Sequence, residues 1–180
     1  MKRWLVLPSL WLAWTLELGC TAEPPASPAT CSSDLQACPA GMTCPSAAQC
    51  LAAPGCAAKG YCRPNGPICS PGCDGDCRAA LVCRQSGACS RQQLDCVASL
   101  ESDCLASDLC RWEGACHLSP SSGTCGPTGP ADCKASSQCR TDGRCTLASG
   151  QCVAATSADC AAADICTKRG RCQPNSGKCR

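Results

Sequence analysis

Cysteine is the residue with the most chemistry to offer in this chain, which has 25 cysteines among its 180 residues. Thiols form disulfides, bind soft metal ions or act as nucleophiles. Zinc and iron–sulfur sites favour C-x2-C pairs, and the sequence contains no C-x2-C and no C-x-C. The spacing therefore favours disulfides, and we expect no metal and no cofactor.

Two short segments leave a metal alternative open. Cys69, Cys73 and Cys77 form the tightest cysteine cluster, with three residues between neighbours, and a set of three thiolates can hold a metal ion. Asp74-Gly75-Asp76 has the start of a calcium loop but not its later ligands or its closing glutamate, so a solvated turn is favoured there.

His117 is the only histidine, and it follows Cys116, which raises the question of a Cys–His nucleophile. The repeat described below assigns Cys116 to a structural disulfide, so its thiol is not expected to react. We therefore predict that the chain is not an enzyme. Trp112 and Tyr61 are expected to be local packing residues, with an exposed Trp112 as a candidate contact point.

The cysteines recur in one register, which is the strongest pattern in the sequence. Five units share the spacing C-x5-C-x5-C-x6-C, with x8 in the third, and they start 27, 27, 29 and 27 residues apart. The five sets are Cys50, Cys56, Cys62 and Cys69; Cys77, Cys83, Cys89 and Cys96; Cys104, Cys110, Cys116 and Cys125; Cys133, Cys139, Cys145 and Cys152; and Cys160, Cys166, Cys172 and Cys179.

Other residues repeat with the cysteines. Alanine always stands two positions after the first cysteine, and glycine always stands two before the third. Aspartate precedes the first cysteine in four units, as in Ser157-Ala158-Asp159-Cys160, which predicts a helix start with serine as its cap. The fixed glycine predicts a turn with positive φ, and residues 145–152 predict a hairpin with Ser-Gly in its loop.

The sequence thus predicts a small disulfide-rich fold of tandem units of about 27 residues, each a short helical turn plus a short β-hairpin, with little regular secondary structure. From Cys20 onward only 14 residues are Leu, Ile or Val, too few for an apolar core to offset roughly 1–2 kcal/mol of backbone entropy per residue. Covalent links must substitute for that core.

Four cysteines per unit allow three internal pairings. Two cysteines six residues apart on one helix are separated by about 9 Å, so pairing of first with second is disfavoured. We expect first–third and second–fourth, with bridges between units as an open alternative. Outside the register, Cys31, Cys38, Cys44 and Cys73 form an even set that is expected to supply two more bridges, and residues 38–50 read as a truncated repeat that caps the array.

The N-terminus reads as an export signal, with Lys2 and Arg3 before an apolar stretch that ends at Cys20. Gly19-Cys20 resembles the lipobox of bacterial lipoproteins, and that resemblance implies cleavage before Cys20 and acylation of its thiol. Glu17 departs from the family, which has an aliphatic residue there. Ordinary cleavage after Ala22 is the alternative, and it predicts a secreted protein.

The chain is expected to divide into a signal peptide (1–19), a lipidated cysteine with a Pro-rich tether (20–30), an irregular cap (31–49) and repeats at 50–76, 77–103, 104–132, 133–159 and 160–180. Residues 31–180 resemble the cysteine-rich repeat lipoproteins of predatory and social delta-class proteobacteria, through text such as "DCKASSQCRTDGRCTLASGQC". That resemblance implies an envelope location and a repeat architecture, without a known activity.

We therefore expect an exported structural or interaction module of the cell envelope, held at the outer membrane or cell surface by its lipid and facing an unknown protein or envelope partner. Aromatic residues do not interleave with the basic ones, so nucleic acid is not an expected partner. One alternative is a protease inhibitor, because Arg84, Arg111, Arg140 and Arg169 lie between second and third cysteines, where a constrained loop is expected. The other is a metal-binding cysteine-rich protein.

Overall fold

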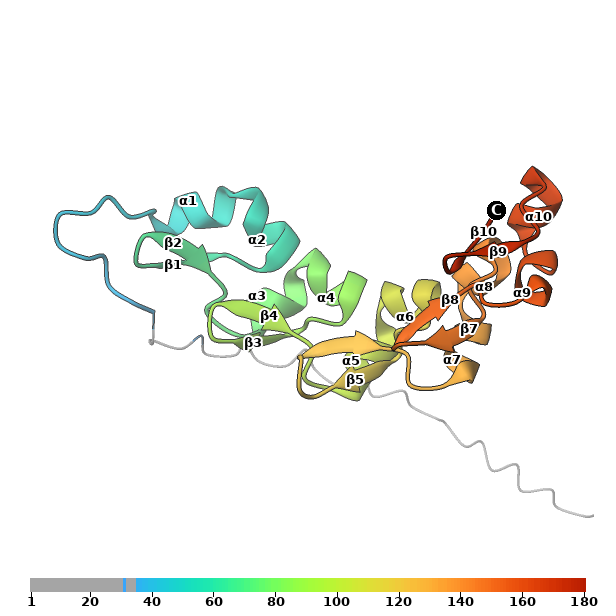
Figure 1. Ribbon diagram of the computed structural model, residues 1–180. Coiled ribbons are helices and arrows are strands. Elements are labelled where there is room, and N and C mark those ends of the chain that lie inside the picture. Colours follow the sequence, from blue (N-terminus) through green and yellow to red (C-terminus); the bar gives the residue numbers. More distant parts are fainter. Residues whose placement is uncertain (1–30, 32–34) are drawn as a thin grey trace, which may run out of the picture.

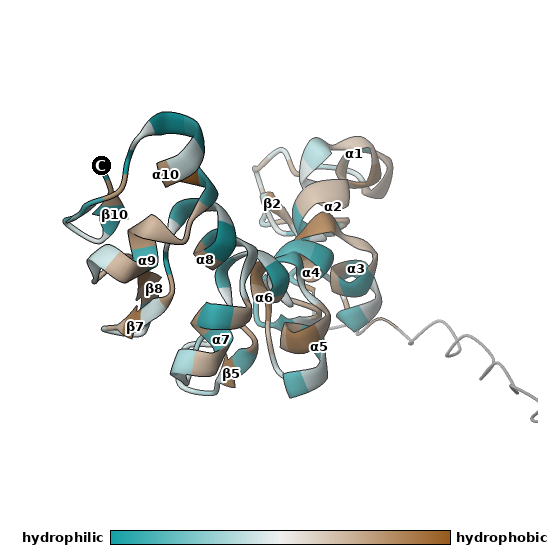
Figure 2. Ribbon diagram, turned by 90° about the vertical axis from the view of Figure 1, so that its right-hand side faces the viewer, coloured by the Kyte–Doolittle hydropathy of each residue, from teal (hydrophilic) through white to brown (hydrophobic). Residues whose placement is uncertain are grey.

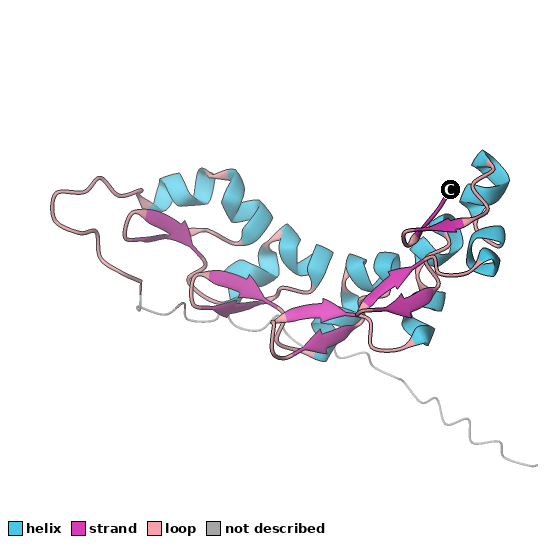
Figure 3. Ribbon diagram, in the orientation of Figure 1, coloured by secondary structure: helices cyan, strands magenta, loops and turns pink. Residues whose placement is uncertain are grey.

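Five similar units follow one another in the computed structural model, which describes residue 31 and residues 35–180 (Figure 1). Each unit contains two short helices and then a two-stranded antiparallel hairpin (Figure 3). The predicted fold class, small, disulfide-rich and tandem with a period of about 27 residues, is confirmed. The signal peptide, Cys20 and the tether lie outside the described residues.

The elements, unit by unit, are as follows. The first unit contains α1 (Ala47–Ala52), α2 (Pro54–Lys59), β1 (Arg63–Asn65) and β2 (Ile68–Ser70). The second contains α3 (Asp74–Ala79), α4 (Leu81–Ser86), β3 (Ser90–Gln92) and β4 (Asp95–Val97). The third contains α5 (Glu101–Ala106), α6 (Asp108–Glu113), β5 (His117–Ser119) and β6 (Thr124–Gly126). The fourth contains α7 (Pro130–Ala135), α8 (Ser137–Asp142), β7 (Thr146–Ala148) and β8 (Gln151–Val153). The fifth contains α9 (Ser157–Ala161), α10 (Asp164–Arg169), β9 (Pro174–Asn175) and β10 (Lys178–Cys179).

The first helix of each unit begins three residues before the first cysteine, and the repeated aspartate secures that start. In the last unit Thr156 is the N-cap, since its hydroxyl accepts from the Asp159 N–H while the Asp159 carboxylate accepts from the Thr156 N–H. Ser157, which we expected to be the cap, is instead the first helical residue. Threonine one position earlier forms the reciprocal pair because the cap and its partner must be three residues apart.

A single residue separates the two helices in the first four units, and two residues separate them in the fifth. Ser107 and Ser136 have extended backbones, and each serine hydroxyl donates to the carbonyl of the first cysteine and accepts from the N–H of the second. The first and second cysteines therefore lie on consecutive helices rather than on one. The second helix ends at the fixed glycine, whose φ is +67° to +79° in all five units. The predicted positive-φ turn is confirmed.

The hairpins follow the expected geometry. In the fourth unit, Thr146 pairs with Val153 and Leu147 with Cys152, and the loop residues Ser149 and Gly150 have φ of +49° and +73°. Positive φ at both loop positions gives the right-handed twist that a two-residue hairpin needs. The return strand carries the fourth cysteine back to the first helix.

The disulfide pairing corrects our expectation. In every unit the first cysteine pairs with the fourth and the second with the third, so first–third with second–fourth is wrong. The glycine turn returns the chain immediately, which leaves the second and third Cα atoms 4.3–4.6 Å apart. The hairpin then places the fourth Cα atom 5.3–5.6 Å from the first.

The four extra cysteines form two bridges, as expected, Cys31–Cys73 and Cys38–Cys44. Cys38 thus has the spacing and pairing of a second cysteine rather than a first. Gln36 contacts the hairpin loop of the first unit, since its carbonyl accepts from the Gly66 N–H at 2.9 Å and its N–H donates to the Asn65 side chain at 2.7 Å. This segment closes the outer end of the first unit.

Sulfur and small side chains make up the interior. The first cysteine of every unit is fully buried. Around these sulfurs lie buried alanines and serines, and several leucines remain exposed. Each unit is therefore closed by a covalent link where a larger domain would use Leu, Ile or Phe.

Neighbouring units pack through the fixed glycine. A Cβ atom at Gly114 would lie 2.6 Å from the Asp132 carbonyl oxygen of the next unit, and one at Gly143 would lie 2.8 Å from that of Asp159. The second helices α2, α4, α6, α8 and α10 contact one another in turn, and the row of units curves with these helices along its inner side (Figure 1). The glycine thus serves both as a helix C-cap and as the point of closest approach between units.

The hairpin side of the junctions differs from one junction to the next. The Ala98 N–H donates to the Gly123 carbonyl at 2.9 Å, and the Ala154 N–H donates to the Gly177 carbonyl at 3.0 Å. The equivalent residues in the first and third units are Pro71 and Pro127, which have no N–H to donate. The second and fourth junctions therefore have a backbone hydrogen bond that cannot form at the first and third, because proline has no N–H.

Candidate functional site: a groove along the inner side

The cysteines form bridges and leave no described thiol for metal or nucleophilic chemistry. Cys69, Cys73 and Cys77, the tightest sequence cluster, belong to three different disulfides. Cys31, Cys73 and an Asp76 oxygen lie within 4.8 Å of one another, but both sulfurs are bonded to each other. A bonded sulfur is not a thiolate ligand, and Arg63 stands 3.3 Å from the same carboxylate.

The Asp74-Gly75-Asp76 segment opens helix α3 rather than forming a solvated turn. The Asp74 carboxylate accepts from the Arg91 N–H at 2.6 Å, and the Asp76 carboxylate accepts from the Gly72 N–H at 2.8 Å. The Asp74 side chain therefore stabilises the hairpin at β3, and the Asp76 side chain stabilises the start of α3. The aspartate pattern that resembled a cation loop is explained by these hydrogen bonds.

His117 lies at the junction of the third and fourth units. Its Nδ1 is 2.5 Å from a Glu101 oxygen in the same unit, and its Nε2 is 3.3 Å from an Asp132 oxygen in the next. Cys116 is bonded to Cys110, so the Cys–His pair of the sequence has no thiol. The imidazole is an electrostatic link between two units.

The charges around His117 shift three pKa values. The hydrogen bond to Glu101 raises the pKa of His117 above 6.5, against partial burial. The Leu118 N–H and His117 lower the pKa of Glu101 below 4.5. Burial alone would raise the pKa of Asp132, but the N–H groups of Thr128 and Gly129 and the His117 charge outweigh it and lower that pKa below 3.8.

This link is therefore complete only in a window of pH. Protonated His117 stabilises the junction fully below about pH 6.5, and this contribution is lost as pH rises through its raised pKa. The ionised Glu101 and Asp132 contribute stability that is lost as pH falls through their lowered pKa values. We expect the single histidine signal in an NMR titration to have a midpoint above 6.5, and Glu101→Gln to lower it more than Asp132→Asn. A wild-type midpoint at or below 6.5 would contradict this assignment.

The four arginines proposed to lie on an inhibitory loop lie on helices α4, α6, α8 and α10. Arg84 is 3.8 Å from Asp108, and Arg111 pairs with the same carboxylate. The expected constrained loop is wrong, because a second helix fills the space between the second and third cysteines. The segment that a protease inhibitor would insert into a protease cleft is therefore helical here and not extended.

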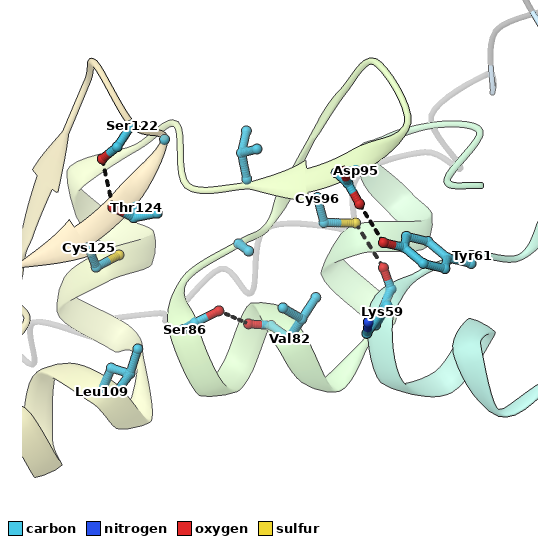
Figure 4. Close-up of a pocket in the computed structure, with 13 residues that line it drawn as sticks. Lys59, Tyr61, Val82, Ser86, Asp95, Cys96, Leu109, Ser122, Thr124 and Cys125 are labelled. Carbon is cyan, nitrogen blue, oxygen red and sulfur yellow. Dashed lines mark hydrogen bonds between the residues drawn. The ribbon is translucent and has the colours of Figure 1, made fainter.

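A groove runs along the inner side, between the second helices and the hairpins; we call it the inner groove. Its first part encloses about 460 Å³ across the junctions of units one, two and three (Figure 4). Its second part encloses about 320 Å³ across the junction of units three and four. Leu109 and Cys125 line both parts, so the two parts adjoin at the third unit.

The first part of the inner groove has an apolar floor and a polar end. Val82 and Leu109 project from helices α4 and α6, and Val97 and the Cys125 sulfur come from the hairpins. At the other end lie Lys59, Tyr61 and Asp95, where the Tyr61 hydroxyl donates to the Asp95 carboxylate across the first junction (Figure 4).

That hydrogen bond, burial and the carboxylate charge raise the pKa of Tyr61. Lys59 lies 5.8 Å from the centre of the tyrosine ring. The aromatic ring lies beside Gly55 of its own unit, in line with the expected local packing, and its hydroxyl links that unit to the next.

The second part of the inner groove is more polar. Glu113, Gln138, Arg144 and Gln151 line it with Leu109 at its border. The Arg144 guanidinium donates to the Gln138 side chain at 3.4 Å. Charged and amide groups therefore follow the apolar floor in one direction along the array.

Trp112 projects from α6 beside the inner groove. It lines a shallow hollow with Gln85, Ser86, Asp108 and Leu109, and it is 47% exposed. The side chain is therefore exposed, which is the condition under which the sequence made it a candidate contact point. Indole groups combine large apolar area with little conformational freedom to lose, which suits a contact surface.

The groove could not be read from the repeat pattern. Its walls come from positions that vary between units, such as Tyr61, Val82, Leu109 and Arg144, and its shape depends on how the units stack. The only signal was the scarcity of large side chains, which made each remaining one a candidate for a special role. Of the described residues that line the two parts, none is a histidine or a free thiol.

No family model matches the chain, and no match was found among the curated proteins or the solved structures. Arguments about function therefore rest on the geometry of this structure alone. Twelve disulfides are typical of an oxidising, extracellular compartment. Within residues 31 and 35–180, every helix is too short or too polar to cross a bilayer.

Proposed function

We propose that the chain is an exported, membrane-anchored interaction module of the cell envelope, which binds a partner in its inner groove without catalysing a reaction. The observation that carries this proposal is a pair of adjoining hollows that together cross three junctions of a covalently closed array. A site assembled from several rigid units loses little entropy when a ligand binds. An extended polypeptide fits its length, its apolar floor and its polar ends.

Cysteine parity agrees with the membrane anchor and equally with cleavage after Ala22, because both take Cys20 out of disulfide pairing. All 24 cysteines from Cys31 onward pair among themselves, so of the 25 in the chain Cys20 alone has no partner left. A free exported thiol would exchange with other disulfides, and acylation would remove it. The Pro-rich stretch of residues 21–30 would then separate the lipid from the array.

Mass spectrometry of the protein purified from the envelope tests the anchor. We expect an N-terminal Cys20 that carries acyl mass and a gain of about 24 hydrogen masses on reduction, one for each bridged cysteine. The Cys20→Ser variant should leave the membrane fraction while keeping its disulfides. An unmodified N-terminus at Glu23 would contradict the anchor and leave the groove untouched.

A library of random peptides displayed on phage tests the groove. Wild-type protein should enrich a family of sequences, and Leu109→Glu should abolish the enrichment because a carboxylate would stand on the apolar floor. Leu105→Glu is the matched control, since Leu105 is 54% exposed on α5 and lies outside the groove. Equal loss in both variants, or no enrichment by the wild type, would contradict the proposed binding.

A further inference from the structure

Three arginines recur at one position of the second helices. Arg84, Arg111 and Arg140 each follow the second cysteine of their unit, on α4, α6 and α8, and all three are exposed. Because α4 contacts α6 and α6 contacts α8, they form a row across three units, which we call the arginine row; hydrophilic segments mark these helices in Figure 2. The acids Glu113 and Asp142 stand two residues after an arginine of the row, and side chains two apart on a helix do not face each other.

Asp108 orients two members of the arginine row. Its carboxylate lies 3.8 Å from the Arg84 guanidinium of the preceding unit and pairs with Arg111 of its own helix. The two arginine side chains are nevertheless 69% and 73% exposed. A guanidinium has five N–H groups in a rigid fork, so one shared carboxylate leaves donors and positive charge free for an anionic ligand.

The exposed indole of Trp112 lies directly beside the arginine row. Arg111 and Trp112 are three and four residues after Asp108, so all three side chains share one side of α6. The hollow that Trp112 lines measures about 440 Å³, and the end of α4 closes its other side with Gln85 and Ser86. A flat apolar ring and a series of cationic groups therefore form one surface.

The polar rim of this hollow favours a ligand rich in hydroxyl groups. The Ser86 hydroxyl donates to the Val82 carbonyl at 2.8 Å, so its oxygen remains able to accept. The Asp108 carboxylate also accepts, and Gln85 has both a carbonyl oxygen and an NH2 group. Sugar hydroxyls supply the donors that these acceptors need, whereas the phosphates of a nucleic acid or a lipid headgroup present acceptors to them.

A chain of pyranose sugars fits both the indole and the spacing of the arginine row. One face of a pyranose presents C–H bonds polarised by neighbouring oxygens, and the negative face of an aromatic ring attracts them. Packed helices lie about 8–10 Å apart, so successive arginines of the row have a similar separation. This is close to the length of a disaccharide, so carboxylates on alternate sugars would meet successive arginines.

We propose that the arginine row and the Trp112 hollow together bind a linear polysaccharide that carries uronic acids. One sugar ring lies on the indole with its hydroxyls toward Asp108 and Gln85, and carboxylates of the same polysaccharide pair with the arginines of the row. The site is separate from the proposed polypeptide site, because Trp112 and the three arginines line neither part of the inner groove. The array thus has two neighbouring surfaces for two kinds of polymer.

An array of uronic-acid oligosaccharides and their methyl esters tests the role of charge. We expect the full-length protein to bind at least one uronate and to lose that binding on esterification, because an ester has no carboxylate charge. Arg111→Ala/Arg140→Ala should weaken binding at least tenfold. The control Lys134→Ala/Lys178→Ala removes the same charge at exposed positions on α7 and β10 and should bind like the wild type. Absence of binding to every uronate, equal binding of the esters or equal loss in both double variants would overturn the proposal.

Substitutions of Trp112 test the stacking separately, and they keep the array folded because the side chain is exposed. Trp112→Phe retains an aromatic face and should retain most of the affinity, whereas Trp112→Leu retains apolar area without that face and should lose roughly tenfold. In a 15N-labelled sample, the indole N–H signal that is absent from Trp112→Phe should shift when the bound uronate is added.

Other polyanions are the competing ligands. Single-stranded DNA and vesicles containing phosphatidylglycerol should bind more weakly than the uronate, because their phosphates do not donate to the polar rim. Wild-type affinity in Trp112→Leu, or tighter binding of DNA or vesicles than of the uronate, would overturn the proposal in favour of a general cationic surface. Peptide enrichment by the inner groove should be unchanged in Arg111→Ala/Arg140→Ala, so failure of the two sites is distinguishable.

Discussion

Replacing Gly114 with alanine is expected to open the junction between units three and four, whereas the same replacement at Gly170 leaves the array intact. Both glycines have left-handed backbones, with φ +77° and +67°, so both variants carry a conformational cost of about 1–2 kcal/mol. Only at Gly114 would the new Cβ lie 2.6 Å from a backbone oxygen, that of Asp132. Backbone cannot rotate away as a flexible side chain can, so the units must separate.

Hydrogen exchange measures this difference with the disulfides intact. The Thr128 and Gly129 N–H groups donate to the Asp132 carboxylate within unit four, and the same carboxylate lies 3.3 Å from His117 of unit three, so these amides sense the separation of the two units. We expect them to exchange at least tenfold faster in Gly114→Ala, equivalent to about 1.4 kcal/mol, and at the wild-type rate in Gly170→Ala. Small-angle scattering should show a larger radius of gyration for the first variant alone. Equal effects would mean that the glycine acts only as a helix cap.

The second large effect is expected from the bridge between the first and fourth cysteines of a unit. Removing Cys104–Cys125 with a pair of alanines should unfold unit three, since the bridge closes a 21-residue separation worth about 3 kcal/mol and its Cys104 sulfur is fully buried. Removing Cys110–Cys116, with a separation of six, should cost less because those cysteines are only partly buried and one helical turn remains around them.

Limited proteolysis distinguishes the two bridges. A protease that cuts beside Leu118 should cleave Cys104→Ala/Cys125→Ala rapidly, and the two halves should part without reductant, because no other described bridge joins the third unit's two sides at that point. Wild-type protein cut at the same site stays joined through Cys104–Cys125. If Cys110→Ala/Cys116→Ala is the more sensitive variant, the interior of the unit has been assigned to the wrong pair.

The sequence predicted the fold through its repeated positions. The alternation of cysteine and glycine specified the number of units, the left-handed turn and the hairpin, because each of those features depends on a few neighbouring residues. The pairing was wrong because the spacing along one expected helix disfavoured only first with second, which is indeed absent, and did not choose between the two remaining patterns. Ser107 and its equivalents interrupt that helix with one extended residue, and no residue type at that position announces the break.

The inner groove depends on contacts between units, and these contacts cannot be read from the sequence of a single unit. Leu109 looks like any partly buried leucine until the α4–α6 contact places it over two junctions. The aspartate before the first cysteine was correctly predicted to support a helix start. Two of its partners in the preceding unit, Arg63 and His117, directly follow a third cysteine, as does Thr146, whose hydroxyl donates to Asp159, whereas Arg78 follows a first cysteine. The residue type at the shared position changes from unit to unit, so the pairing was not predicted.

The closed bonding within each unit has a consequence for how the protein matures. Every described bridge except Cys31–Cys73 joins cysteines 6 to 21 residues apart, so a unit that has just reached an oxidising compartment holds all the cysteines that its own bridges need. Such a chain can form its disulfides unit by unit as it is exported, and each oxidised unit is held folded before the next one arrives. Cys31 is the exception, since it must wait 42 residues for Cys73.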